Sequence, residues 1–108
     1  MSKERLVEYN NGALWSLEEE GSFLLGVTQN GLDQAGSIIA IDLSEAGDEY
    51  DQGDWIGEVR GKDLVLEIVA PFDLRLIERN EEILDQPNVL EDDPTGDAWM
   101  LRVEKRND

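Results

Sequence analysis

Residues 55–69 read Trp-Ile-Gly-Glu-Val-Arg-Gly-Lys-Asp-Leu-Val-Leu-Glu-Ile-Val, two β-rich runs on either side of a short polar stretch. The runs are Trp55–Val59 and Leu64–Val69, and the polar stretch Arg60–Asp63 contains a glycine suited to a turn. Two such runs joined by a short loop with a glycine are typical of a β-hairpin. The stretch therefore predicts an antiparallel hairpin with a polar tip.

The same pattern extends along the whole chain of 108 residues. Short apolar runs are interrupted by Gly, Asp or Asn about every ten residues, which is typical of an all-β sandwich or barrel. No Pro-rich or low-complexity segment marks a boundary. We expect one mainly β domain over residues 1–108, with helix in a minor part.

Further elements are predicted before the hairpin. Ala13–Leu17 and Phe23–Val27 are expected to pair antiparallel across a five-residue loop. Thr28 is suited to cap a short helix over Gln29–Ala35, which Gly36 would end in a left-handed conformation. The nearly continuous apolar run Ser37–Leu43 predicts a buried strand.

After the hairpin, apolar residues alternate from Leu64 to Leu76, so Asp73 and Arg75 are expected to face solvent. Asn80 is suited to cap a helix that starts at Glu81-Glu82 and is limited by Pro87. A last strand is expected over Ala98–Val103, centred on Trp99.

The charge is strongly acidic, with 26 Asp and Glu against 9 Lys and Arg and a formal net charge of −17. This charge repels phosphate backbones and anionic membranes, so we expect neither nucleic-acid nor membrane binding. Twelve acidic residues and no basic ones lie between Arg5 and Arg60. Within that half, the carboxylates of Asp48, Glu49 and Asp51 form one candidate acidic face for a basic partner. A role in solubility alone is the alternative.

The composition also excludes much catalytic chemistry. The chain has no Cys and no His, so a Ser-His-Asp triad, a thiolate nucleophile and an imidazole or thiolate zinc site are excluded. Asp48–Val59 departs from a calcium loop, because Val59 stands where the closing Glu is required. Asp92-Asp93 is expected to be a solvated turn. We expect no catalytic residues and no metal site, and a protein that carries a group or binds partners.

No apolar run reaches the 18 residues of a membrane span, and no apolar core follows Met1–Leu6 as in a signal peptide. These two features predict a cytoplasmic protein.

Lys62 lies at the predicted hairpin tip and is one of three lysines, with Lys3 and Lys105 near the termini. An exposed, projecting lysine is what a covalent group carrier requires. An ordinary solvated turn residue is the alternative interpretation.

Several segments correspond to motifs of one family. They are Gly26-Val27-Thr28 before the short helix, Gln34–Ile39, the turn Leu43–Asp48, and the Asp-Pro-Thr-Gly-Asp-Ala-Trp sequence of Asp93–Trp99. Trp15 corresponds to a family tryptophan near the N-terminus. The chain thereby resembles the H protein of the glycine cleavage system, a lipoyl-carrying β-domain. The resemblance implies a lipoyl/biotinyl-type barrel-sandwich hybrid with short helices.

The lipoylation motif of that family, E-S-x-K-A, falls on Arg60-Gly61-Lys62-Asp63-Leu64. By this resemblance Asp63 occupies the lipoyl-lysine position and Lys62 lies one residue early. Adjacent positions on a strand point to opposite faces, so the slip is expected to redirect the amine unless the turn is rearranged. Arg60 also replaces an acidic residue with the opposite charge, which weakens recognition by a lipoylating enzyme.

Three hypotheses follow. In the first, the chain is a non-catalytic docking, regulatory or scaffold protein that binds enzymes of a glycine-cleavage-type or lipoate-dependent system. In the second, Lys62 carries lipoate and transfers an aminomethyl or acyl group between enzymes. In the third, the acidic surface mimics a nucleic-acid backbone as a decoy. The oligomeric state is open in all three.

Overall fold

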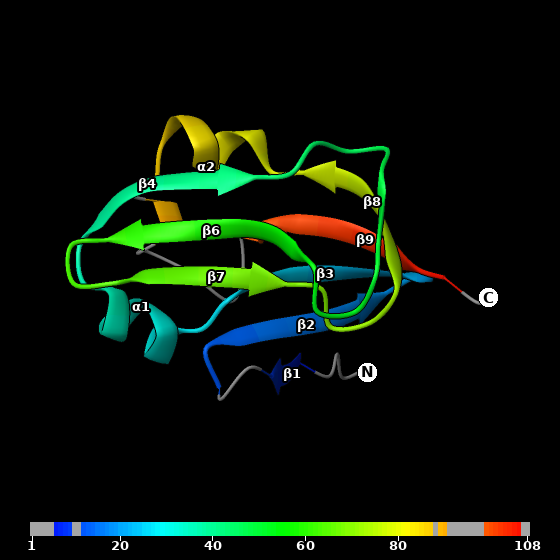
Figure 1. Ribbon diagram of the computed structural model, residues 1–108, viewed down its shortest axis with the longest axis horizontal. Coiled ribbons are helices and arrows are strands. Elements are labelled where there is room, and N and C mark those ends of the chain that lie inside the picture. The colour runs from blue at the N-terminus through cyan, green and yellow to red at the C-terminus, as the bar shows by residue number, and fades with distance from the viewer. Residues whose placement is uncertain (1–5, 10–11, 88, 91–98, 107–108) are drawn as a thin grey trace.

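The computed structural model describes residues 6–9, 12–87, 89–90 and 99–106. Within these residues the chain forms two antiparallel sheets and two short helices (Figure 1). The strands are β1 (Leu6–Tyr9), β2 (Leu14–Glu19), β3 (Ser22–Val27), β4 (Ile38–Leu43), β5 (Glu49–Tyr50), β6 (Trp55–Gly61), β7 (Val65–Val69), β8 (Leu74–Arg79) and β9 (Leu101–Lys105). The helices are α1 (Gln29–Ala35) and α2 (Glu81–Asp85).

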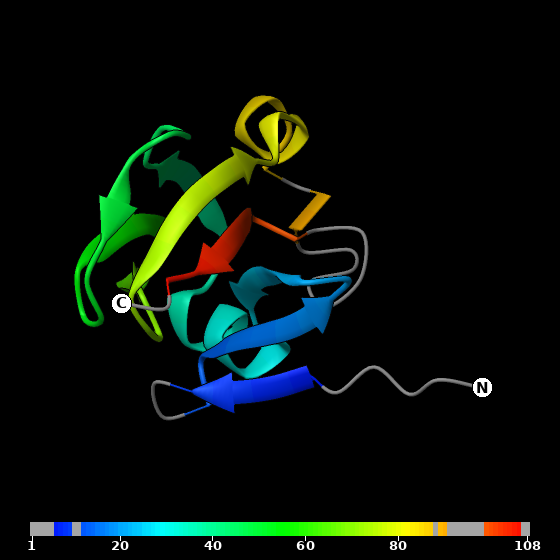
Figure 2. The ribbon, with the colours of Figure 1, turned by 90° about the vertical axis from the view of Figure 1, so that its right-hand side faces the viewer.

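The larger sheet has the strand order β1-β2-β3-β9-β8-β5, and the smaller one has the order β4-β6-β7. The smaller sheet lies in front of the larger one in Figure 1, and Figure 2 shows the two layers from the side. The predicted mainly β architecture is therefore confirmed. The hairpin predicted from residues 55–69 is also present, with β6 and β7 paired from Trp55↔Val69 to Arg60↔Val65.

The core lies between the sheets and is built from alternate residues of the strands. In β7 Leu66 and Ile68 are buried, and in β8 Leu74 and Leu76 are fully buried. This confirms the period-two pattern, except that Leu64 is 40% exposed because it ends the turn before β7 begins. Each fully buried Leu or Ile contributes about 1.5–3 kcal/mol by leaving water.

The hairpin of β2 and β3 is tighter than expected. The ladder continues to Glu19↔Ser22, so only Glu20 and Gly21 form the loop instead of the five predicted residues. Both have positive φ, 51° and 88°, as a two-residue turn between right-handed twisted strands requires. The charges of Glu18 and Glu19 suggested a loop, but both residues pair across the hairpin and belong to β2.

Trp15 of β2 is fully buried, and its Nε1–H donates to the Val27 carbonyl at 2.9 Å. The indole lies over the backbone of Gly26 on β3, where a Cβ atom would come within 2.6 Å of the ring. The glycine therefore makes room for the tryptophan.

The predicted cap residues of α1 are confirmed. The Thr28 hydroxyl accepts a hydrogen bond from the Gly31 N–H at 3.0 Å. Gly36 ends the helix with a positive φ of 83°, but its ψ of −160° differs from the left-handed helical conformation that was predicted. For α2 the Asn80 side chain accepts from the Glu82 N–H at 3.1 Å, which also confirms that prediction.

Two predicted strands were partly wrong. β4 alternates between buried and exposed side chains because only one face of the smaller sheet packs on the core. Ile39, 67% exposed, lies where the register with β6 shifts between Ile38 and Ala40. The last strand begins at Leu101 and extends to Lys105, so Trp99 precedes it. Ala98 and Asp92-Asp93 lie outside the described residues.

The longer of the two helices, α1, has seven residues, whereas a membrane span requires about 20. In the part of the chain that the structure describes, no helix has the length and apolarity to cross a bilayer.

Candidate functional site

The tip of the β6–β7 hairpin is a tight turn with Lys62 and Asp63 at its centre. The Gly61 N–H donates to the Leu64 carbonyl at 2.9 Å, and Arg60↔Val65 is the last pair of the ladder. Both central side chains are exposed. Among the described non-glycine residues only Glu20 has positive φ, so this turn does not require the left-handed region.

The turn is fixed to the C-terminal end of α1 by backbone hydrogen bonds. The Lys62 N–H donates to the Ser37 carbonyl at 2.8 Å, and the Asp63 and Leu64 N–H groups both donate to the Ala35 carbonyl, at 2.8 and 3.4 Å. A helix end leaves carbonyls without partners inside the helix, and here the turn supplies donors. The hairpin tip and α1 therefore form one connected unit.

Two glycines permit this close approach. A Cβ atom on Gly61 would collide with the Ala35 carbonyl, and one on Gly36 would lie 2.6 Å from Asp63 Oδ2. The Asp63 carboxylate thus lies against the backbone that follows α1. The sequence predicted Gly61 in a turn and Gly36 at the end of the helix, but it did not predict that the turn packs against the helix end, because this contact is set by tertiary packing.

Lys62 and Asp63 both lie in the turn between β6 and β7, so the alternation of side chains along a strand does not apply to them. Lys62 has no hydrogen bond or ion pair to any other described residue, apart from the backbone bond to Ser37. Lys105, although near the C-terminus, is also on a folded element: it ends β9, and its Nζ lies 5.4 Å from the Phe72 ring centroid.

Arg60 adjoins the turn and is paired along its own strand. Its Nε–H donates to Glu58 Oε2 at 2.9 Å. The hydrogen bond and charge of Glu58, together with the charge of Asp42, raise the pKa of Arg60 above its usual value. The positive charge next to the turn is thus bound to a neighbouring carboxylate.

An open depression of about 270 Å³ lies beside the hairpin tip. It is lined by Gln29, Leu32, Asp33, Gly36 and Ser37. Because Gly36 touches Asp63 and the Ser37 carbonyl binds the Lys62 N–H, the depression and the turn are adjacent. Such a place can receive a short flexible group with polar ends.

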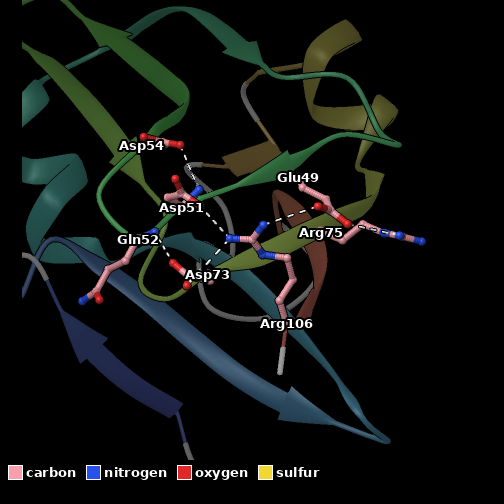
Figure 3. A network of polar contacts seen from close by, with 7 residues as sticks. All are labelled: Glu49, Asp51, Gln52, Asp54, Asp73, Arg75 and Arg106. Carbon is pink, nitrogen blue, oxygen red and sulfur yellow. Dashed lines mark hydrogen bonds and ion pairs between the residues drawn. The ribbon is translucent and has the colours of Figure 1, made fainter. Parts of the chain in front are cut away.

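Within the candidate acidic face of Asp48, Glu49 and Asp51, the carboxylates of Glu49 and Asp51 are paired with Arg75 of β8 and with Arg106, which follows β9 (Figure 3). Arg106 lies 2.6 Å from Asp51 and 3.4 Å from Glu49, and Arg75 lies 3.2 Å from Glu49. The hydrogen bonds from Arg75 and Arg106 lower the pKa of Glu49, and the hydrogen bond to Asp51 raises the pKa of Arg106. Sequence reasoning missed this arrangement because the partners are 26 or more residues apart.

Arg106 also lies 3.7 Å from Asp73, whose Oδ1 accepts from the Gln52 N–H at 2.8 Å. This cluster joins the end of β9 to β5 and to the loop before β8. In the part of the chain that the structure describes, no group of three or more carboxylates is arranged to hold a metal ion. Through its contacts with Glu49, Asp51 and Asp73, Arg106 holds these chain segments together.

The sequence profile described as "Glycine cleavage H-protein" matches residues 7–108. A "Glycine cleavage system H protein" from Prochlorococcus marinus subsp. pastoris is 34% identical over 90 residues, which cover 83% of this chain and 70% of that protein. Another from Listeria monocytogenes serotype 4b is 30% identical over 105 residues, 97% of this chain and 84% of the relative.

The fold matches the crystal structure of a glycine cleavage system H protein from Mycobacterium marinum with a TM-score of 0.85. The match has 23% sequence identity and covers 93% of this chain and 83% of that one. It confirms the fold that the sequence resemblance implied. The family profile spans nearly the whole chain and agrees with the curated relatives, so this chain belongs to the glycine cleavage H-protein family.

Proposed function

We propose that this chain is a non-catalytic docking protein of the glycine-cleavage type that works without a lipoyl arm. It binds enzymes of a glycine-cleavage-type or lipoate-dependent system in the cytoplasm, as a competitor, regulator or scaffold. The observation that carries the proposal is the hairpin turn held against the end of α1, taken together with the sequence resemblance, which aligns Asp63 with the lipoyl-lysine of the family motif.

The backbone of the turn opposes a shift of Lys62 into that position. A one-residue slip would break the hydrogen bonds of Lys62 and Asp63 to the end of α1 and the bond between Gly61 and Leu64. Each such bond contributes about 0.5–1.5 kcal/mol. The slip would also move a non-glycine side chain into the place of Gly61, against the Ala35 carbonyl. These costs support an arm-free role.

The charge beside the turn supports the same role. In this alignment Arg60 stands where the family motif has an acidic residue, and its guanidinium is bound to Glu58. An enzyme that selects its target through an acidic side chain would meet the opposite charge here. Both altered positions belong to the surface such an enzyme must contact.

A second candidate function is lipoyl transfer through Lys62. The exposed ammonium of Lys62 and the adjacent depression favour it. Of the two central turn residues only Lys62 has an amine that can form an amide with the lipoate carboxyl group, and Asp63 has none. When bound, lipoate would supply the swinging dithiolane that carries the transferred group.

The two functions are separated by intact mass after incubation with lipoate, ATP and a lipoate ligase. The matched positive control is the double variant Arg60→Glu/Asp63→Lys, which restores both motif positions. We expect the native chain and Lys62→Ala to keep their masses while the double variant gains one lipoyl group. A lipoyl mass on the native chain that is absent from Lys62→Ala would refute the proposal and establish the carrier function.

A further inference from the structure

The outward face of the three-stranded sheet carries a cross-strand row of three carboxylates, here called the acidic row. Glu58 of β6 pairs with Asp42 of β4 on one side and with Glu67 of β7 on the other. Cross-strand neighbours point the same way, with Cβ atoms about 4.5–5.5 Å apart. Arg60 and Val65 form part of the next row toward the hairpin tip.

The acidic row is only partly neutralised. Arg60 binds Glu58, whose side chain is 17% exposed. The side chains of Asp42 and Glu67 are exposed and form no hydrogen bond or ion pair with any other described residue, although the charge of Asp42 also acts on Arg60. Like charges directly opposite each other destabilise a sheet. Of the three carboxylates, only that of Glu58 is bound to Arg60.

Apolar side chains flank the acidic row along the same face. On β7, Val65 and Val69 lie two residues before and after Glu67 and therefore point outward with it. Val65 is 50% exposed, and Trp55, the cross-strand partner of Val69, is 43% exposed. Neither helix lies over this side of the sheet, since α1 lies beside the hairpin tip and α2 beside β4 (Figure 1).

We propose that this outward face docks a basic amphipathic helix of a partner protein. The inference rests on the proposed function, in which the chain binds other proteins, and it names the surface and the chemistry of the partner. Lysines or arginines three or four residues apart on a helix are about 5–6 Å apart, which matches the spacing of the acidic row. Apolar residues beside them would contact Trp55 and Val65.

Arg60 reduces the negative charge that this surface offers to a basic partner. Its guanidinium occupies Glu58, so removing it leaves all three carboxylates for the partner. Arg60→Gln is therefore expected to strengthen binding of a basic helix about two- to fivefold.

The test is an amide NMR titration of the full chain with a synthetic amphipathic helix of about 18 residues, long enough to be helical. The peptide carries Lys at every fourth position on one face, with Leu beside it. The double variant Asp42→Asn/Glu67→Gln is compared with Glu18→Gln/Asp85→Asn, which removes two exposed charges elsewhere and keeps the same net charge.

We expect shift changes concentrated on β4, β6 and β7, and binding that is roughly three- to tenfold weaker in the acidic-row variant than in the control. Equal weakening in both variants would show attraction to the net charge alone and would overturn the inference. Shift changes centred on another face would overturn it as well.

The same two variants are then titrated with a purified glycine-cleavage enzyme that binds H proteins. Weaker binding of the acidic-row variant alone supports the inference. Equal binding of both variants overturns it and leaves the proposed function intact. An enzyme that binds neither variant nor the native chain counts against the proposed function, and the peptide titration then decides the inference by itself.

Discussion

Gly61→Ala tests the fixed hairpin turn on which the proposed function depends. The φ angle of Gly61 is not in the left-handed region, so alanine is permitted by the backbone and only its Cβ atom matters. That atom would collide with the carbonyl oxygen, the carbonyl carbon and the Cβ atom of Ala35. A backbone carbonyl cannot rotate away as a flexible side chain can, so the turn must move off α1.

Overpacking of this kind costs about 1–3 kcal/mol, and the displacement also breaks the bonds from the turn to Ala35 and Ser37. A domain of this size loses roughly 4–8 °C in Tm for each kcal/mol. We therefore expect Tm to fall by roughly 4–24 °C. Lys62→Ala, an exposed change in the same turn, should stay within about 0.5 kcal/mol of the native chain.

Urea unfolding followed by tryptophan fluorescence measures the loss, and hydrogen exchange locates it. The amides of Lys62 and Asp63 should exchange faster in Gly61→Ala, whereas those of the β2–β3 ladder should keep their protection. A variant with native stability and native exchange at Lys62 and Asp63 would refute the reasoning, because the turn would then not be held against α1.

Three further predictions concern charge and pH. Burial raises the pKa of the Tyr9 phenol, whose O–H donates to the Val69 carbonyl at 3.3 Å, so the free energy of unfolding should fall as pH rises above about 10. Urea unfolding between about pH 8 and 11 should show a smaller fall in free energy for Tyr9→Phe than for the native chain. Equal falls in the two proteins would contradict this prediction. The lowered pKa of Glu49 means that its ion pairs stabilise the fold above about pH 4.3 and are lost as pH falls through the folded pKa. Glu49→Gln should therefore lose less stability on acidification, measured as urea midpoints, and a loss as large as in the native chain would argue against the tie with Arg75 and Arg106. With a net charge of −17, raising NaCl from about 0.02 to 0.5 M should raise Tm, because it screens self-repulsion; a falling Tm would mean that attractive pairs dominate.

The sequence predicted those parts of the fold that local chemistry decides. α1 begins after Thr28, whose side chain accepts a backbone hydrogen bond, and ends at Gly36, which can adopt a positive φ. The polar residues after Val59 were also predicted correctly to form the tip of a hairpin. The β2–β3 loop was predicted too long because cross-strand pairing outweighs the local charge of Glu18–Glu20.

The candidate residues could be named from the sequence, but their geometry could not. Lys62 and Asp63 were both named from the sequence, yet their fixed orientation comes from carbonyls of Ala35 and Ser37 that only the tertiary structure brings to the turn. The pairing of Arg106 with Asp51 across 55 residues likewise has no local signal. Candidate residues at Asp93–Ala98 lie outside the described part of the chain.

The central claim is that this chain docks without a lipoyl arm, and the dissociation constant of the unmodified chain tests it most directly. The chain and Lys62→Ala are produced without lipoate, checked by mass, and titrated calorimetrically into a glycine-cleavage enzyme that binds H proteins. The account predicts measurable binding by the unmodified chain and an affinity for Lys62→Ala within about twofold of it, since an exposed charge contributes little. Binding that requires lipoate on Lys62, or that disappears in Lys62→Ala, would contradict the account.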